Sequence, residues 1–146
     1  MKTKITQILL ILFVGLVGVF SVNAQYKINT LEQGQTLRTN QGLRSENGQF
    51  NLLLQSDGNL CLYKNGDTFI QCTSTNSKKP TNLQMQEDGN LAMYDAKKNH
   101  VWSTDTYRGS DDQKGGKLVL ENDGNLVLYS VSGKPIYDFN KGKRLY

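Results

Sequence analysis

One short stretch of the chain carries hydrogen-bonding side chains at alternate positions. This stretch, "QEDGNLAMY", places Gln86, Asp88, Asn90 and Tyr94 on one side of an extended backbone. A carboxylate accepts hydrogen bonds, an amide donates and accepts them, and a phenol can do either. Such a set beside a small apolar residue suits a ligand covered in hydroxyl groups, because each hydroxyl also donates and accepts. The pattern therefore predicts a carbohydrate site.

Two further stretches repeat this pattern, so the chain contains three similar units. Aligned on Asp57, Asp88 and Asp123, the units are offset by 31 and 35 residues, and a tyrosine follows each aspartate six residues later. An Asp-Gly-Asn sequence makes a good turn by itself, but a turn requires neither the preceding glutamine or glutamate nor the following tyrosine. The candidate carbohydrate-binding residues are Gln55, Asp57, Asn59 and Tyr63 in the first unit, Gln86, Asp88, Asn90, Ala92 and Tyr94 in the second, and Glu121, Asp123, Asn125, Val127 and Tyr129 in the third.

The elements that must position these residues are β-strands. Leucine alternates with other residues on both sides of each Asp-Gly turn, and no stretch beyond residue 24 has the period of an α-helix. Because strand side chains alternate between faces, Leu126 and Leu128 should face a core while the polar residues face outward. Trp102 and Tyr137 should join that core, as should Gln71, whose buried amide would need a hydrogen-bond partner. We predict an all-β fold with three similar sheets.

The two cysteines, Cys61 and Cys72, predict one disulfide. An Asn-Gly pair between them is typical of a hairpin turn. If a four-residue loop, Asn65 to Thr68, joins the two strands, then Lys64 pairs with Phe69 and the cysteines lie opposite each other. A two-residue turn would place the cysteines diagonally, which suits the bridge less well. The bridge is expected to add about 2 to 3 kcal/mol to the stability of the fold.

The first 24 residues are predicted to be a secretory signal peptide. Two lysines precede an apolar run from Ile8 to Phe20, and Val22-Asn23-Ala24 is a small-residue cleavage pattern. The alternative is a membrane anchor, but the run is shorter than the roughly 20 residues of a spanning helix. We therefore expect a secreted, extracellular protein that starts near Gln25, is not inserted in a membrane, and forms one domain over residues 25–146.

Composition argues against a nucleic-acid-binding protein and against an enzyme. Cleavage would leave 15 basic and 13 acidic residues, a net charge of +2, with the lysines scattered. The single histidine, His100, precedes an expected strand, and a paired thiol is neither a nucleophile nor a metal ligand. Asp111 and Asp112 lie in a polar loop, where a solvated charge pair is the simpler interpretation than acid–base machinery. We expect no catalytic residue, metal or other cofactor.

The repeated pattern Gln-x-Asp-x-Asn-x-Val-x-Tyr resembles the bulb-type mannose-binding lectins of the snowdrop kind. The resemblance extends from about Asn29 to Phe139, and "LEQGQTLRTNQ" looks like the opening strand of that family. It implies a β-prism II fold of three four-stranded antiparallel sheets with pseudo-threefold symmetry. It also implies metal-free binding of mannose or high-mannose glycans, and frequent dimers, so a homodimer is an expectation.

The resemblance also implies a role for each position of the motif. The aspartate would accept from the axial 2-hydroxyl of mannose, and the asparagine would donate to the same oxygen. The glutamine position would meet the 3-hydroxyl, the tyrosine would meet the 4-hydroxyl, and the valine position would pack against the sugar. Mannose is singled out because its 2-hydroxyl is axial.

No unit matches the family pattern completely. The second unit has Ala92 at the valine position and is expected to be the best site, while the third has Glu121 at the glutamine position and is expected to rank next. In the first unit Cys61 stands where the sugar should rest, so that copy is expected to be structural. The alternative function is a secreted β-prism that serves as a structural or protein-interaction module in defence, with degenerate sugar sites.

Overall fold

The computed structural model describes residues 24–141, 143 and 144. The predicted signal peptide lies outside this part, except for Ala24. The strands are β1 (Gln25–Lys27), β2 (Thr30–Glu32), β3 (Thr36–Arg38), β4 (Gln41–Arg44), β5 (Phe50–Leu54), β6 (Leu60–Lys64), β7 (Thr68–Cys72), β8 (Asn82–Met85), β9 (Leu91–Tyr94), β10 (His100–Ser103), β11 (Gly115–Leu120), β12 (Leu126–Ser130), β13 (Pro135–Asp138) and β14 (Lys143–Arg144). Within the same residues, the only helical element is a 3-10 turn, η1 (Asn76–Lys78), and no helix is long and apolar enough to span a bilayer.

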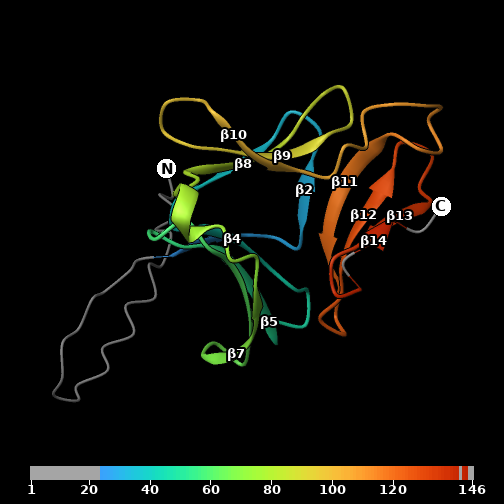
Figure 1. The fold of residues 1–146 in the computed structure, drawn as a ribbon. Coiled ribbons are helices and arrows are strands. Elements are labelled where there is room, and N and C mark those ends of the chain that lie inside the picture. The colour runs from blue at the N-terminus through green and yellow to red at the C-terminus, as the bar shows by residue number, and fades with distance from the viewer. Residues whose placement is uncertain (1–23, 142, 145–146) are drawn as a thin grey trace, which may run out of the picture.

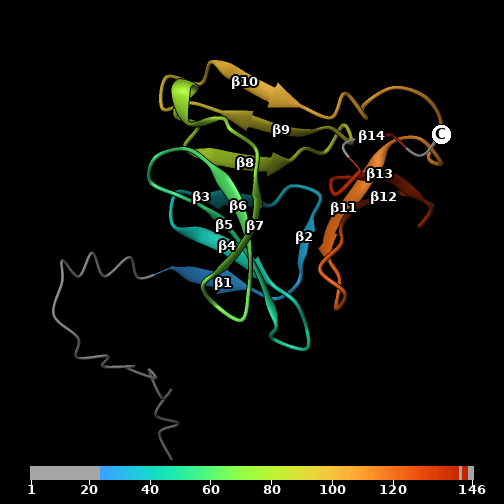
Figure 2. The ribbon, with the colours of Figure 1, turned by 60° about the horizontal axis from the view of Figure 1, so that its bottom comes forward.

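The strands form three sheets that stand like the sides of a prism (Figures 1 and 2). The first repeat unit supplies β5, β6 and β7 to the first sheet, the second unit supplies β8, β9 and β10 to the second sheet, and the third unit supplies β11, β12 and β13 to the third sheet. The N-terminal segment adds one strand to each sheet in reverse order, with β4 in the first, β3 in the second and β2 in the third. This all-β architecture is the predicted β-prism II.

The prediction of three four-stranded antiparallel sheets needs one correction. The first and third sheets each have five strands, because β1 joins the first at one edge and β14 joins the third. Strand β1 runs parallel to β4, and Tyr26 lies opposite Gly42. A Cβ atom at Gly42 would lie 1.9 Å from the Leu52 carbonyl oxygen and 3.0 Å from Cδ1 of Tyr26. The close approach of the Leu52 backbone therefore requires glycine here, and the Tyr26 ring lies against the same position.

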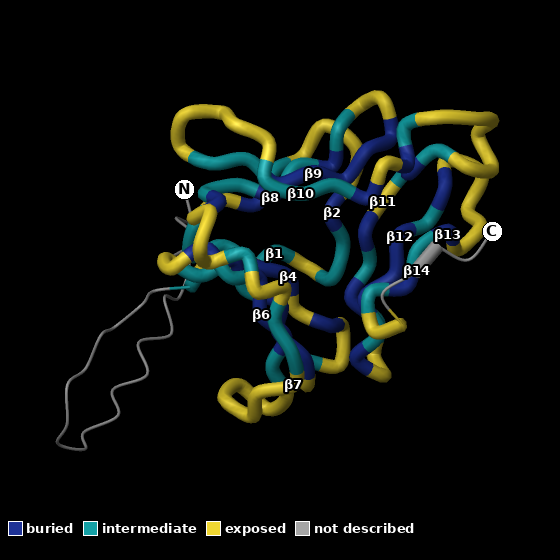
Figure 3. Tube along the Cα trace, in the orientation of Figure 1, coloured by how far each residue is buried: buried dark blue, intermediate teal, exposed yellow. Residues whose placement is uncertain are grey.

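The inner faces of the three sheets share one apolar core. Leucines from all three sheets fill it, and Leu126 and Leu128 are among them, as their spacing predicted. Figure 3 shows the buried positions on the strands and the exposed positions mainly on the connecting loops. Trp102 and Tyr137 pack against the core, whereas Gln71 is half-buried at the equivalent position and donates to Oδ1 of Asn140 at 3.1 Å. The polar member of the core layer thus has the hydrogen-bond partner that it requires.

The predicted disulfide between Cys61 and Cys72 is confirmed, with 4.2 Å between the Cα atoms. The predicted pairing at the loop is wrong, because Lys64 lies opposite Thr68 and Phe69 lies opposite Tyr63. A three-residue loop therefore joins the strands, and an irregularity in the register follows between Leu62 and Tyr63. The extra residue of this β-bulge restores the pairing, so that the cysteines still face each other.

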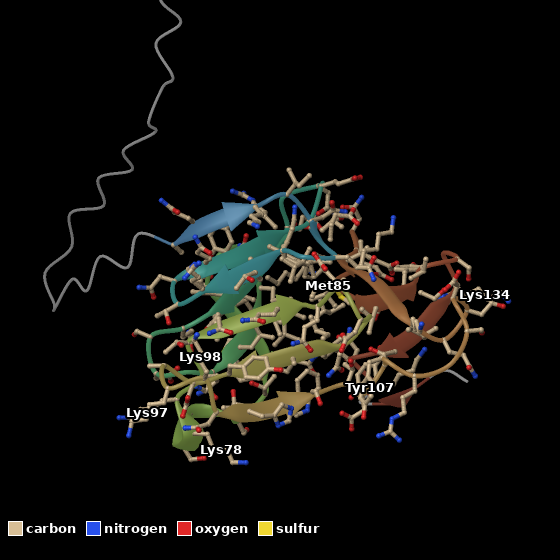
Figure 4. All side chains as sticks on the ribbon, turned by 90° about the horizontal axis from the view of Figure 1, so that it is seen from above. Lys78, Met85, Lys97, Lys98, Tyr107 and Lys134 are labelled. Carbon is tan, nitrogen blue, oxygen red and sulfur yellow. A yellow bond between two sulfur atoms is a disulfide. The ribbon has the colours of Figure 1, made fainter. Side chains whose placement is uncertain are left out.

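Lysine side chains are spread along the surface. Figure 4 shows Lys78, Lys97 and Lys98 near one end of the molecule and Lys134 near the other. Lys134 forms an ion pair with Asp112 across an exposed loop. These four lysines thus lie in two separate regions.

Candidate functional site

Each copy of the motif begins at a tight turn between the two central strands of its sheet. In the first copy the backbone amide of Gly58 donates to the backbone carbonyl of Gln55 at 3.0 Å, and the backbone amide of Gln55 donates to the backbone carbonyl of Asn59 at 2.8 Å. The other two copies repeat both backbone bonds. Gly58 has a φ of +91°, which an L-residue rarely adopts. A Cβ atom there would also lie 2.7 Å from Cα of Lys79. The turn therefore requires glycine for its conformation and for its close approach to the segment that follows β7.

The glutamine or glutamate of each copy contacts the tyrosine eight residues later. The contacts join Gln55 to Tyr63 at 2.6 Å, Gln86 to Tyr94 at 3.0 Å, and Glu121 to Tyr129. In the first two copies the amide nitrogen donates to the phenol oxygen, so the phenol proton remains available for a ligand. In the third copy the phenol donates to the carboxylate, so the phenol can only accept from a ligand. The change from glutamine to glutamate therefore reverses the hydrogen-bonding polarity of the tyrosine.

The aspartate and asparagine of each copy lie together at the turn. In all three copies one aspartate oxygen accepts from the asparagine backbone amide at 2.8 to 2.9 Å. In the first and third copies the asparagine side-chain nitrogen also donates to the other aspartate oxygen at 3.1 Å. The backbone bond orients each carboxylate, and its second oxygen faces the asparagine amide. Each copy thus holds two hydrogen-bonded pairs, one between the aspartate and the asparagine and one between the glutamine or glutamate and the tyrosine.

The second copy differs from the other two in how its asparagine is held. Asn90 is only 8% exposed, and its Oδ1 lies 3.5 Å from the Thr104 hydroxyl oxygen. Among the described contacts, the Asn90 side-chain nitrogen makes no bond to Asp88. The amide donor and the outer oxygen of Asp88 are therefore not joined to each other in this copy. Gln86 and Asp88 also line a hollow of about 430 Å³ beside the motif.

The valine position forms the floor of each copy. Ala92 is fully buried in the second copy, and Val127 is 6% exposed in the third. In the first copy the floor is the disulfide, and Oε1 of Gln55 lies 3.2 Å from Sγ of Cys61. A disulfide has no S–H group, so this contact is not a hydrogen bond donated by sulfur. The bridge fills the place where the other copies have aliphatic carbon.

In the third copy the carboxylates change the pKa of the tyrosine. The hydrogen bond to Glu121, then burial, then the negative charges of Glu121 and Asp123 raise the pKa of Tyr129 to about 12. The amide of Asn140 donates to Oδ1 of Asn125 at 2.8 Å, which turns the nitrogen of Asn125 toward Asp123. The third copy thus has an orderly hydrogen-bond network and two carboxylates at the motif positions, where the second copy has one.

Sequence reasoning missed the threonines that support two of the turns. Thr75 donates to the Gly58 carbonyl at 2.7 Å, and Thr106 donates to the Gly89 carbonyl at 2.7 Å. Each of these threonines contacts a second threonine two residues earlier at 2.8 Å. The signal was present in the sequence, because "TST" and "TDT" are separated by the same 31 residues as the first two aspartates. The threonine pairs position the turns without facing a ligand.

Among the residues considered for enzyme chemistry, His100 contacts the motif, whereas no described contact joins Asp111 or Asp112 to it. Asp111 and Asp112 lie in an exposed loop, where hydrogen bonds from Lys134 and Ser132 lower the pKa of Asp112. His100 is exposed at the start of β10, but its ring packs edge-on against Tyr94 at 5.8 Å between centroids. That contact places the histidine beside the second copy, which its position in the sequence did not reveal. Within the described residues, no group of three or more His, Cys, Asp or Glu is arranged to hold a metal ion.

Neither the models of known protein families nor the curated protein sequences contain a match to this chain. Several solved structures match it. A Japanese Marasmius oreades lectin is 28% identical over 81% of this chain and 96% of its own, with a TM-score of 0.70. Monomeric monocot mannose-binding lectins from Gastrodia elata give 31% identity over 80% of this chain and 99% of theirs, with a TM-score of 0.63.

A third structure is the mannose-specific agglutinin from snowdrop (Galanthus nivalis) bulbs in complex with methyl-α-D-mannoside. It is 36% identical over 70% of this chain and 89% of its own, with a TM-score of 0.59. The identities, the coverage and the shared prism agree with the repeated motif. The chain belongs to the bulb-type, snowdrop-like family of mannose-binding lectins.

Proposed function

We propose that this protein is a secreted lectin that binds mannose or high-mannose glycans through up to three shallow sites, without a metal ion. The observation that carries the proposal is the repetition in each copy of an acid or amide paired with a tyrosine and of an aspartate paired with an asparagine. The related structures from Gastrodia elata and snowdrop, which are named for mannose, support the choice of sugar.

The second copy is the principal site in this proposal. One oxygen of Asp88 is held by the Asn90 backbone, so the other oxygen can accept a proton from an axial hydroxyl while the Asn90 amide donates to the same hydroxyl. Gln86 and Tyr94 would bind the adjacent hydroxyls. In the first and third copies one N–H of the asparagine side chain is already bonded to the aspartate, which leaves one fewer donor for a sugar hydroxyl. The second copy has no such bond between the two side chains among the described contacts.

Binding in this proposal depends on hydrogen bonds and on apolar contact at the valine position, and the chain is assigned no catalytic activity. A single sugar in a shallow site makes few buried contacts, so each site should bind weakly. Useful strength would come from several sites engaging one glycan surface, and a homodimer would double their number. The proposal therefore predicts much tighter binding to a mannan surface than to mannose in solution.

The test is an NMR titration with methyl-α-D-mannoside that follows Tyr63, Tyr94 and Tyr129 separately. We expect saturable shifts at Tyr94, weaker shifts at Tyr129 and none at Tyr63, with the same result in the presence of a metal chelator. Loss of all shifts on adding chelator would contradict metal independence. A folded chain that responds at none of the three tyrosines would favour the alternative of a structural or protein-interaction module.

Secretion has its own test. Protein recovered from the medium of expressing cells should begin at Gln25 when its N-terminus is sequenced. An intact Met1 in the recovered protein would contradict the signal peptide, and absence of the protein from the medium would contradict the proposed location.

A further inference from the structure

A hollow of about 420 Å³ lies on the outer face of the first sheet, beside the first copy of the motif. It lies between β1, the end of β4 and the loops that follow β4 and β6. Its lining residues are Tyr26, Arg44, Gly48, Asn51, Asn65 and Gly66. This set contains a phenol, a guanidinium and two amides, and Arg44 is its one charged member. We call it the edge pocket.

The edge pocket contains a buried polar atom without a partner. Asn51 is 5% exposed, and its Oδ1 makes no hydrogen bond in the described part of the chain. The equivalent residue of the second sheet is Asn82, whose Oδ1 accepts from Gln84 at 2.9 Å. The first sheet has Leu53 in place of that glutamine, and leucine cannot donate. A buried acceptor left without a donor is costly, so a hydroxyl from a ligand would be stabilising there.

Arg44 gives the edge pocket its charge. Its Nη2 donates to the Gly48 carbonyl at 3.2 Å, which holds the guanidinium against the loop after β4. The ion pairs found among the described residues, Lys134 with Asp112 and Lys141 with Asp138, do not involve it. The carboxylate of Glu46 lines an adjoining hollow together with Arg44. Most N–H groups of the guanidinium are thus available to a carboxylate ligand.

Tyr26 closes the edge pocket on the side of β1. The pKa of Tyr26 is raised, and burial is the largest cause. The nearby Arg44 charge lowers this pKa, and the nearby Tyr63 phenol raises it. The tyrosine therefore lies close both to the guanidinium and to the first copy of the motif. The second sheet has the equivalent arginine, Arg38, but no fifth strand and hence no such tyrosine. The edge pocket belongs to the first sheet alone.

We propose that the edge pocket binds a sugar unit that carries a carboxylate, such as a uronic acid, next to the first copy of the motif. The carboxylate would pair with the Arg44 guanidinium, a ring hydroxyl would donate to Oδ1 of Asn51, and the sugar would lie against Tyr26. A volume of this size is typical of small-ligand sites. The inference rests on the proposed function, since it adds an acidic sugar to the glycans that the protein recognises.

The test is an NMR titration of the folded chain with methyl-β-D-glucuronide and with its neutral counterpart, methyl-β-D-glucoside. The glucuronide should give saturable shifts at the Asn51 amide and the Tyr26 ring, and the glucoside should bind at least about 10-fold more weakly. Arg44→Gln should lose this preference, whereas Arg38→Gln, the same change in the second sheet, should keep it. Glu46→Gln should strengthen glucuronide binding by removing a like charge.

Mannoside shifts at Tyr94 provide the separate readout for the proposed function, and they should be the same in the Arg44→Gln chain. Failure at Asn51 with a normal response at Tyr94 would reject the edge pocket alone. Equal affinity for glucoside and glucuronide, or equal shifts with inorganic sulfate, would also overturn it. If Arg44→Gln fails to fold, the salt dependence of the unaltered chain tests the proposal. Added salt should weaken glucuronide binding and leave the mannoside response at Tyr94 unchanged. Glucuronide binding that does not depend on salt would reject the proposal.

Discussion

The first and second copies of the motif carry the same glutamine, aspartate, asparagine and tyrosine, yet they offer a sugar different surroundings. In the first copy the floor is the bridge between Cys61 and Cys72, and the Asn59 amide is bonded to Asp57. In the second copy the floor is Ala92, and Asn90 is buried against Thr104. Identical polar residues therefore do not make identical sites.

The difference teaches that two separate conditions must hold. The turn between the central strands must carry the glutamine, aspartate and asparagine, and the strand that follows must carry the tyrosine, and both copies meet that condition. The residue under the sugar and the partner of the asparagine must also leave the donors and acceptors available. We infer that the second condition separates a binding copy from a structural one.

The largest effect is expected when the second copy loses its aspartate and asparagine. Asp88→Ala combined with Asn90→Ala should reduce mannan binding by about 100-fold, because a charge-assisted hydrogen bond and a second donor are lost. Surface binding to immobilised mannan measures the effect. The matched change, Asp57→Ala with Asn59→Ala, should reduce binding by less than about 3-fold. Equal losses in the two variants would remove the distinction between the copies.

The next effect concerns the floor of the first copy. Replacing Cys61 by valine and Cys72 by serine should lower the free energy of unfolding by about 2 to 3 kcal/mol, because the bridge no longer restrains the unfolded chain. Denaturant unfolding measures this loss, and chemical reduction of the unaltered chain should reproduce it. The same variant should acquire a mannoside response at Tyr63. A folded variant whose Tyr63 stays silent would show that the disulfide is not what blocks the site.

A smaller effect is expected from the floor of the second copy. Ala92→Val adds two methyl groups, and about 1 kcal/mol of apolar contact should raise mannoside affinity at Tyr94 roughly 5-fold. In the third sheet the equivalent position is Val127, which pairs with Val119 on the neighbouring strand, so the fold accommodates valine at this position. Val127→Ala is the matched control and should weaken the third copy by a similar factor. Unchanged affinity in both variants would mean that the floor does not contact the sugar.

Much of this comparison could be predicted from spacing alone. The alternation around Leu126 and Leu128 predicted the buried face, and the repeat predicted the three sheets. The pairing of Cys61 with Cys72 was also predicted, although through a loop that is one residue too long. Local geometry determines these features, because a period of two fixes the face on which each side chain lies.

Features that depend on distant contacts could not be predicted in this way. The three residues of strand β1 pair with β4, and the Tyr26 ring lies against Gly42. The side chain of Asn90 lies beside Thr104, which follows β10 and is 14 residues away in the sequence. Such contacts depend on which strands become neighbours, and the spacing of a motif does not contain that information.

The smallest effect at neutral pH is expected in the third copy, where Glu121→Gln restores the glutamine of the motif. The change removes the acceptor that binds the Tyr129 proton, so the pKa of Tyr129 should fall from about 12 toward its ordinary value of 10.0. A raised tyrosine pKa favours the neutral phenol in the folded state. Its contribution to stability is therefore complete below pH 10 and is lost as the pH rises from 10 to 12. NMR titration of the Tyr129 ring measures the shift directly.

The same substitution also tests the polarity of the site. With an amide in place of the carboxylate, the nitrogen of residue 121 can donate to the phenol, as Gln86 does to Tyr94, and the Tyr129 proton becomes available to a sugar. Mannoside affinity at Tyr129 should rise by about 3-fold, because the sugar gains one weak hydrogen bond between neutral groups. The third copy would then resemble the second in its donors and would keep its own valine floor. If the pKa falls and the affinity does not rise, the direction of the tyrosine hydrogen bond does not limit binding at the third copy. The bond between the side chains of Asn125 and Asp123 would then be the next contact to remove.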